Sequence, residues 1–100
     1  MTTTIKELDS EIVALFEGRL DTAAAQQTEK DIQPLLSPNG KNVVLDCSKL
    51  EYISSSGLRI FLSILKAVKP MGSHVCITGM NADIKNVFTM TGFNNLFDFR

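Results

Sequence analysis

The sequence predicts one α/β domain with a mixed sheet, an N-terminal hairpin followed by parallel strands, covered by three or more helices. The main reason is the expected order of elements, β-β-α-β-α-β-α-(β), because strands that alternate with helices form βαβ units. The chain has 100 residues, the size of one domain. Hydrophobic residues make up 44% and charged residues 21%, which is typical of globular proteins. We therefore expect residues 1–100 to form a single domain.

The first part of the chain predicts a hairpin and then a helix. Residues 5–8 and 12–16 have the composition of short strands, and Asp9-Ser10 between them predicts a tight turn. Both faces of the second strand are apolar, which is typical of a central strand. Thr22 is the expected N-cap of a helix that runs to about Gln33, where a proline ends or kinks it.

The rest of the chain predicts the parallel strands and their helices. Residues 42–46 and 74–78 are short apolar runs with the pattern of buried strands, and residues 58–69 form a long apolar helix. Asn81 is the expected cap of a third helix, and residues 93–100 add a last strand at the edge.

Functional groups of a parallel sheet lie at the carboxyl ends of its strands. Three predicted loops meet that description, namely residues 18–22, 47–57 and 79–81. We therefore expect binding or catalytic residues in these three loops.

Charge, hydropathy and cysteine content exclude several classes of protein. Ten basic and eleven acidic residues leave a net charge of −1, which gives nucleic-acid binding little electrostatic support. The apolar runs are far shorter than the roughly 20 residues that cross a bilayer, so we expect no membrane insertion. The N-terminus lacks the apolar core of a signal peptide, and Cys47 and Cys76 fit no metal spacing. We expect reduced thiols in a cytoplasmic protein.

Three consecutive serines, Ser54, Ser55 and Ser56, stand where a predicted loop becomes a helix. One serine there is an ordinary N-cap, but a cap does not require three hydroxyls, and no Glu or Gln completes a capping box. One interpretation is a cap with small polar turn residues beside it. The other is phosphorylation or anion binding, because a helix N-terminus offers free N–H groups to a phosphate. Spacing alone leaves both open.

An enzymatic site has weaker support. A serine nucleophile needs a base, and the one histidine, His74, opens a strand at the opposite edge of the sheet. Asp21 and Asp46 each follow an apolar strand, where a pair of carboxylates could bind a metal, but capping or binding of loop amides is commoner for such residues. Of the two, Asp21 is the better candidate for an exposed functional residue. No glycine-rich phosphate loop and no adenine- or ribose-binding motif are present, so we expect no enzyme, metal or cofactor.

The predicted helix 58–69 carries a narrow polar stripe of Arg59, Ser63 and Lys66. Its apolar arc is wider than the roughly 100° that one buried face needs. Either the helix packs on the sheet and on a neighbouring helix, or Ile60 and Ile64 are partly exposed and contribute to a partner surface.

Four segments taken in order resemble one family, and the second and third together are the most specific part. They are Gly18-Arg19-Leu20-Asp21, Val43-Val44-Leu45-Asp46-Cys47-Ser48, Ile53-Ser54-Ser55-Ser56-Gly57-Leu58 and Met90-Thr91-Gly92-Phe93. In these residues the chain resembles a STAS domain, and specifically a bacterial anti-sigma factor antagonist.

The resemblance implies a small mixed sheet with helices and no catalysis. Members bind an anti-sigma factor, which is often a serine kinase, and thereby free its sigma factor. Phosphorylation of one serine abolishes that binding, and a phosphatase restores it. Carried over to this chain, the phosphoacceptor is Ser55. We expect the partner-binding surface to comprise Asp21, Ser54, Ser56, Gly57, Leu58 and Ile60.

The chain departs from the family at Ser54, where an aspartate is usual. The departure removes a charge beside the phosphoacceptor. It mildly favours an alternative function, in which the same fold is a constitutive interaction subunit, for example of a membrane lipid-transport complex, and the serine loop is a fixed docking surface.

Overall fold

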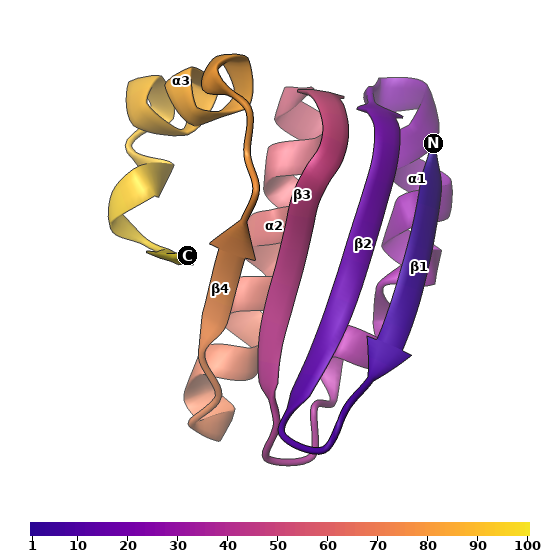
Figure 1. The fold of residues 1–100 in the computed structure, drawn as a ribbon, viewed down its shortest axis with the longest axis vertical. Helices are drawn as coiled ribbons and strands as arrows, with labels where there is room; N and C mark the ends of the chain where they lie inside the picture. Colours follow the sequence, from indigo (N-terminus) through magenta and orange to yellow (C-terminus); the bar gives the residue numbers. More distant parts are fainter.

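The computed structural model describes residues 1–100 and shows the expected order of elements (Figure 1). The strands are β1 (Thr2–Glu7), β2 (Glu11–Leu20), β3 (Asn42–Ile53), β4 (Val75–Thr78) and β5 (Asp98–Phe99). The helices are α1 (Thr22–Asp31), α2 (Ser55–Val68) and α3 (Ala82–Thr91), and a short 3-10 turn follows each of them. No helix combines the length and the apolar character needed to cross a membrane.

The strands form one five-stranded sheet in the order β1-β2-β3-β4-β5. β1 pairs antiparallel with β2, and the other neighbouring strands are parallel. The Leu8 N–H donates to the Glu11 carbonyl at 2.8 Å, which closes the predicted turn at Asp9-Ser10. The predicted fold class is confirmed, as are the hairpin and the central position of the second strand.

α1 and α2 lie behind the sheet in the view of Figure 1, so both cover the same face. Three aromatic rings join the layers in the core. Phe61 of α2 lies between Phe16 of β2 and Phe88 of α3, with ring centroids 5.2 and 6.1 Å away. Aromatic pairs at this separation stabilise a core beyond the area that they bury.

α2 is covered on two sides, because it packs against both the sheet and α1. Ile60 is 5% exposed and Ile64 is fully buried. The first interpretation of the wide apolar arc is therefore confirmed. The alternative, with Ile60 and Ile64 partly exposed, is wrong.

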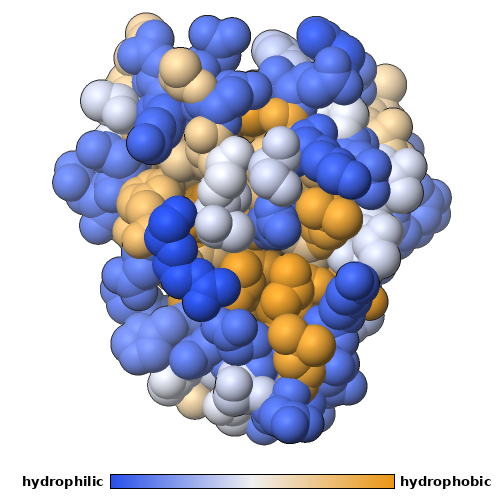
Figure 2. Space-filling model, viewed as in Figure 1, coloured by the Kyte–Doolittle hydropathy of each residue, from blue (hydrophilic) through white to orange (hydrophobic).

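The opposite face of the sheet has no helix over it. Figure 2 shows an apolar patch in the middle of this face with hydrophilic residues around it. Val13 of β2 pairs with Val44 of β3 there, yet Val44 is only 2% exposed. Arg100, which follows β5, forms an ion pair with Glu11 of β2 at 3.1 Å, so its side chain spans β3 and β4.

Several predicted boundaries are wrong. β3 does not end at residue 46 but continues to Ile53, so most of the predicted loop 47–57 is strand. The extension forms because it pairs with the second half of β2, as in the pair Leu20 and Ile53. α2 starts at Ser55, three residues earlier than expected, and the N-cap of α1 is Asp21 in place of Thr22.

Candidate functional site

Hydrogen bonds connect the ends of β2 and β3 with the loop after β4. The Ser54 N–H donates to the Leu20 carbonyl at 2.8 Å, which joins the end of β3 to the end of β2. The Asn81 side-chain amide donates to the Leu50 carbonyl at 3.3 Å, which joins the loop after β4 to β3. The carboxyl ends of β2 and β3 and the loop after β4 therefore lie together at one edge of the sheet.

The three serines have different environments. Ser54 is the N-cap of α2, and its Oγ accepts a hydrogen bond from the Gly57 N–H at 3.2 Å. It is only 8% exposed. Ser55 occupies the first helical position, is exposed, and its hydroxyl makes no hydrogen bond within the protein, whereas Ser56 is half-buried. One hydroxyl thus caps the helix, and the hydroxyl of Ser55 is free.

The first turn of α2 is packed tightly against the ends of β2 and β3. A Cβ on Gly57 would lie 2.7 Å from Cγ of Leu20 and 2.8 Å from Cγ1 of Ile53. Contacts under 3.0 Å essentially never occur at a real Cβ, so only glycine allows this approach. The absence of a side chain at Gly57 therefore fixes where Ser55 stands above the sheet.

The charged residues around the serines have separate roles. Asp21 caps α1, and its carboxylate accepts a hydrogen bond from the Ala24 N–H at 2.9 Å. The guanidinium carbon of Arg19 lies 4.5 Å from the centre of the Tyr52 ring. This is a cation–π contact between the last residues of β2 and β3. The sequence analysis missed this pair, because it depends on the part of β3 that was expected to be a loop.

A groove of about 830 Å³ runs between α1 and α2, beside the serines. Its lining comprises Thr22, Ala23, Ala25, Gln26 and Glu29 from α1, and Ser56, Arg59, Ile60 and Ser63 from α2. Ser56 and Ile60, both predicted partner-binding residues, therefore line one groove. Gly57 and Leu58 are also predicted partner-binding residues, but both are buried and neither lines the groove.

The remaining polar candidates lie apart from the serines. Asp46 accepts two hydrogen bonds from Ser48, at 3.0 Å from its N–H and 2.7 Å from its hydroxyl. The expected binding of a nearby amide is therefore present, but it lies within β3 and not in a loop after the strand. His74 contacts Asp98 at 3.8 Å, and no group of three His, Cys, Asp or Glu side chains could hold a metal ion.

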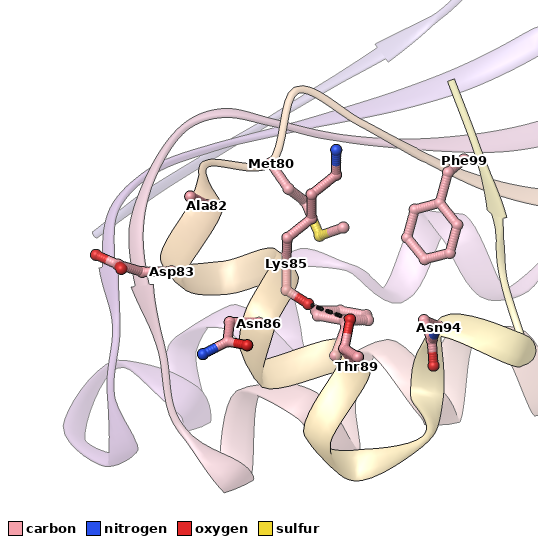
Figure 3. A pocket seen from close by; sticks show the side chains of 9 residues that line it. Met80, Ala82, Asp83, Lys85, Asn86, Thr89, Asn94 and Phe99 are labelled. Carbon is pink, nitrogen blue, oxygen red and sulfur yellow. Dashed lines mark hydrogen bonds between the residues drawn. The ribbon is translucent and has the colours of Figure 1, made fainter.

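A second hollow, of about 720 Å³, lies between α3 and the end of the chain (Figure 3). Met80, Lys85 and Phe99 point toward it from three segments. It contains none of the predicted site residues. The candidate site is therefore the surface around Ser55 together with the groove between α1 and α2.

Comparison of the sequence with known protein families identifies the family of this chain. The sequence profile described as "STAS domain" matches residues 3–100. The chain belongs to the STAS domain family. Among its relatives, BtrV of Bordetella bronchiseptica is 29% identical over 97 residues, which is 97% of this chain and 84% of BtrV. The anti-sigma-B factor antagonist of Listeria monocytogenes is 22% identical over 97 residues, 96% of this chain and 85% of the relative.

Solved STAS structures share the fold. The phosphorylated form of SpoIIAA, a Bacillus cell fate determinant, superposes with a TM-score of 0.74 at 15% identity, over 99% of this chain and 91% of SpoIIAA. Anti-sigma factor antagonists are regulatory proteins without catalytic activity. The two relatives above are anti-sigma factor antagonists by name, and the sequence likewise predicts a protein without catalytic activity.

Proposed function

We propose that this STAS domain is a cytoplasmic, phosphorylation-switched anti-sigma factor antagonist. The unmodified form binds an anti-sigma factor, itself a serine kinase, and frees its sigma factor. The kinase phosphorylates Ser55 and ends the interaction, and a phosphatase restores it. The observation that carries the proposal is the free, exposed hydroxyl of Ser55 at the start of α2, beside a serine that is already used as the cap.

The surroundings of Ser55 explain how a phosphate would prevent binding. The phosphate adds about −1.5 to −2 charges at neutral pH. A partner that covers the start of α2 and the adjacent groove would have to desolvate that charge, which is costly unless it is paired. The unmodified surface, with neutral Ser55 and Ser56 beside the groove, has no such cost.

The replacement of the usual aspartate by Ser54 leaves the cap intact. Serine and aspartate are similarly good N-caps, and the Ser54 Oγ makes the expected bond to the Gly57 N–H. The geometry around Ser55 therefore does not depend on the missing carboxylate. This supports the carry-over of the phosphoacceptor to Ser55.

The direct test is incubation with ATP and a candidate anti-sigma factor kinase from the same genome, followed by fragment-ion mapping. We expect one phosphate on Ser55, and none on the Ser55→Ala variant. Phosphate on Ser56 would move the site by one residue. A kinase that binds but adds no phosphate would contradict the switch.

The second candidate function is the constitutive interaction subunit, which serine in place of the usual aspartate at position 54 favours. Binding to a partner that is insensitive to charge at Ser55 would support it. Equal affinities of the unmodified protein and the Ser55→Asp variant would therefore favour this candidate over the antagonist.

A further inference from the structure

We propose that Arg59 is the intramolecular receptor of the phosphate on Ser55. The inference rests on the proposed function, because it concerns the modified state of the same site. It adds a second effect to phosphorylation: besides bringing negative charge, the phosphate would withdraw the guanidinium of Arg59 from the rim of the groove between α1 and α2.

The spacing places the two side chains together. Ser55 and Arg59 are four residues apart in a continuous helix, so their side chains are neighbours one turn apart. Both are exposed, and they continue the polar stripe through Ser63 and Lys66. An anion that precedes a cation by four residues is the favourable orientation of such a pair. A phosphate also accepts two parallel N–H bonds from an arginine, which a lysine cannot offer.

Arg59 is also not engaged elsewhere. It forms no ion pair, and its guanidinium makes no hydrogen bond within the protein. α2 has no acidic residue in its first turn, so this cation lies near the positive end of the helix without compensation. A phosphate on Ser55 would supply the missing negative charge.

The other charged groups around the site are less well placed. On α1, Asp21 is used as the cap and Glu29 lines the far wall of the groove. On β2, Arg19 is stacked on Tyr52. Arg19 would have to leave Tyr52 to bind the phosphate. It is the cation that competes with Arg59 for the phosphate, so the experiment must separate the two.

The test uses the full chain with phosphoserine inserted at position 55 during translation, and follows the phosphate by ³¹P NMR against pH. The second pKa of a free phosphoserine is about 6. A neighbouring cation favours the dianion and lowers that pKa. We expect Arg59→Gln to raise the phosphate pKa by about 0.15–0.4, which is the strength of an exposed i,i+4 ion pair converted to a pKa difference. Lys66→Gln, a matched loss of one charge further along the stripe, should leave it unchanged.

The outcomes separate the inference from the proposed function. An unchanged phosphate pKa in Arg59→Gln, or an equal change in Lys66→Gln, would overturn the role of Arg59. A change confined to Arg19→Gln would assign the phosphate to Arg19 instead. Because the phosphoserine is inserted without a kinase, failure of a kinase to modify Ser55 would contradict the proposed function alone.

Discussion

The Oγ of Ser54 accepts a hydrogen bond from the N–H of Gly57 at 3.2 Å, and this bond uses one of three adjacent serines as the cap of α2. Ser54 is used as the cap, Ser56 is half-buried beside the groove, and Ser55 is left exposed. The first turn of α2 thus combines a structural serine and a candidate regulatory serine in adjacent positions.

Two substitutions at Ser54 should separate the effect of the N-cap hydrogen bond on stability from the effect of a negative charge at the helix N-terminus. Ser54→Ala removes the acceptor and should destabilise the protein by about 1 kcal/mol. Ser54→Asp keeps an acceptor and adds a favourable charge at the helix N-terminus, so its stability should stay within about 0.5 kcal/mol of the original. Urea unfolding followed by circular dichroism measures both. Equal stability of the alanine variant and the original protein would show that the bond is unimportant.

Gly57→Ala should be destabilising even though alanine is the better helix former. Alanine gains about 0.8–1 kcal/mol in helix propensity, but its Cβ would clash with Leu20 and Ile53, and overpacking costs about 1–3 kcal/mol. We expect a net loss of about 1 kcal/mol in unfolding experiments. Leu20→Ala makes room for the new methyl group, so a double-mutant cycle should show a favourable coupling. A stabilised Gly57→Ala variant would contradict the close packing.

Cys47 should make the protein sensitive to alkaline pH. Burial, with a smaller contribution from Asp46, raises the pKa of its thiol to about 12. In the unfolded chain the thiol has its ordinary pKa of 9.0, so above that pH the unfolded state loses the proton first and stability falls as the pH rises toward 12. At pH 10 this loss is about 1.4 kcal/mol, and Cys47→Ala should remove that part of the pH dependence. Identical alkaline profiles would refute the assignment.

The sequence predicted those strands and helices that are determined by neighbouring residues in the chain, such as a β-branched run or an N-cap residue. The β-branched run at Val43 and Val44 predicted the first half of β3, and Asn81 predicted the start of α3, where its side chain accepts a bond from the Ile84 N–H at 2.8 Å. The secondary-structure prediction was wrong where a contact between distant segments determines the structure. The second half of β3 alternates poorly because its pairing with β2 contains register shifts, for example between Gly18 and Arg19.

The candidate site was predicted only in part for the same reason. Adjacent serines have identical propensities, so only the backbone geometry shows that Ser54 is the cap. The wide apolar arc of α2 allowed two interpretations for Ile60, and the packing of α1 against α2 decides for burial. The contact of Arg19 with Tyr52 depends on the unpredicted strand extension.

The charge at position 55 should control partner binding. Ser55→Asp should weaken binding of the anti-sigma factor, because the added carboxylate must be desolvated on docking. Ser55→Ala should bind as well as the unmodified protein and should not be released by kinase and ATP. Calorimetric titration of both variants measures the affinities. Indistinguishable affinities of Ser55→Asp and the unmodified protein would contradict a charge-operated switch.

The central claim is that phosphorylation of Ser55 acts on the surface and not on the fold. The most direct measurement compares the melting temperature and the partner affinity of the same protein with and without the phosphate. We predict that the phosphorylated form melts at or slightly above the unmodified temperature, because the charge–dipole interaction at the start of α2 is worth about 0.3–1 kcal/mol. Its affinity should be at least about tenfold lower, equivalent to about 1.4 kcal/mol. A phosphorylated protein that melts several degrees lower, with amide shifts spread across the sheet, would contradict the claim.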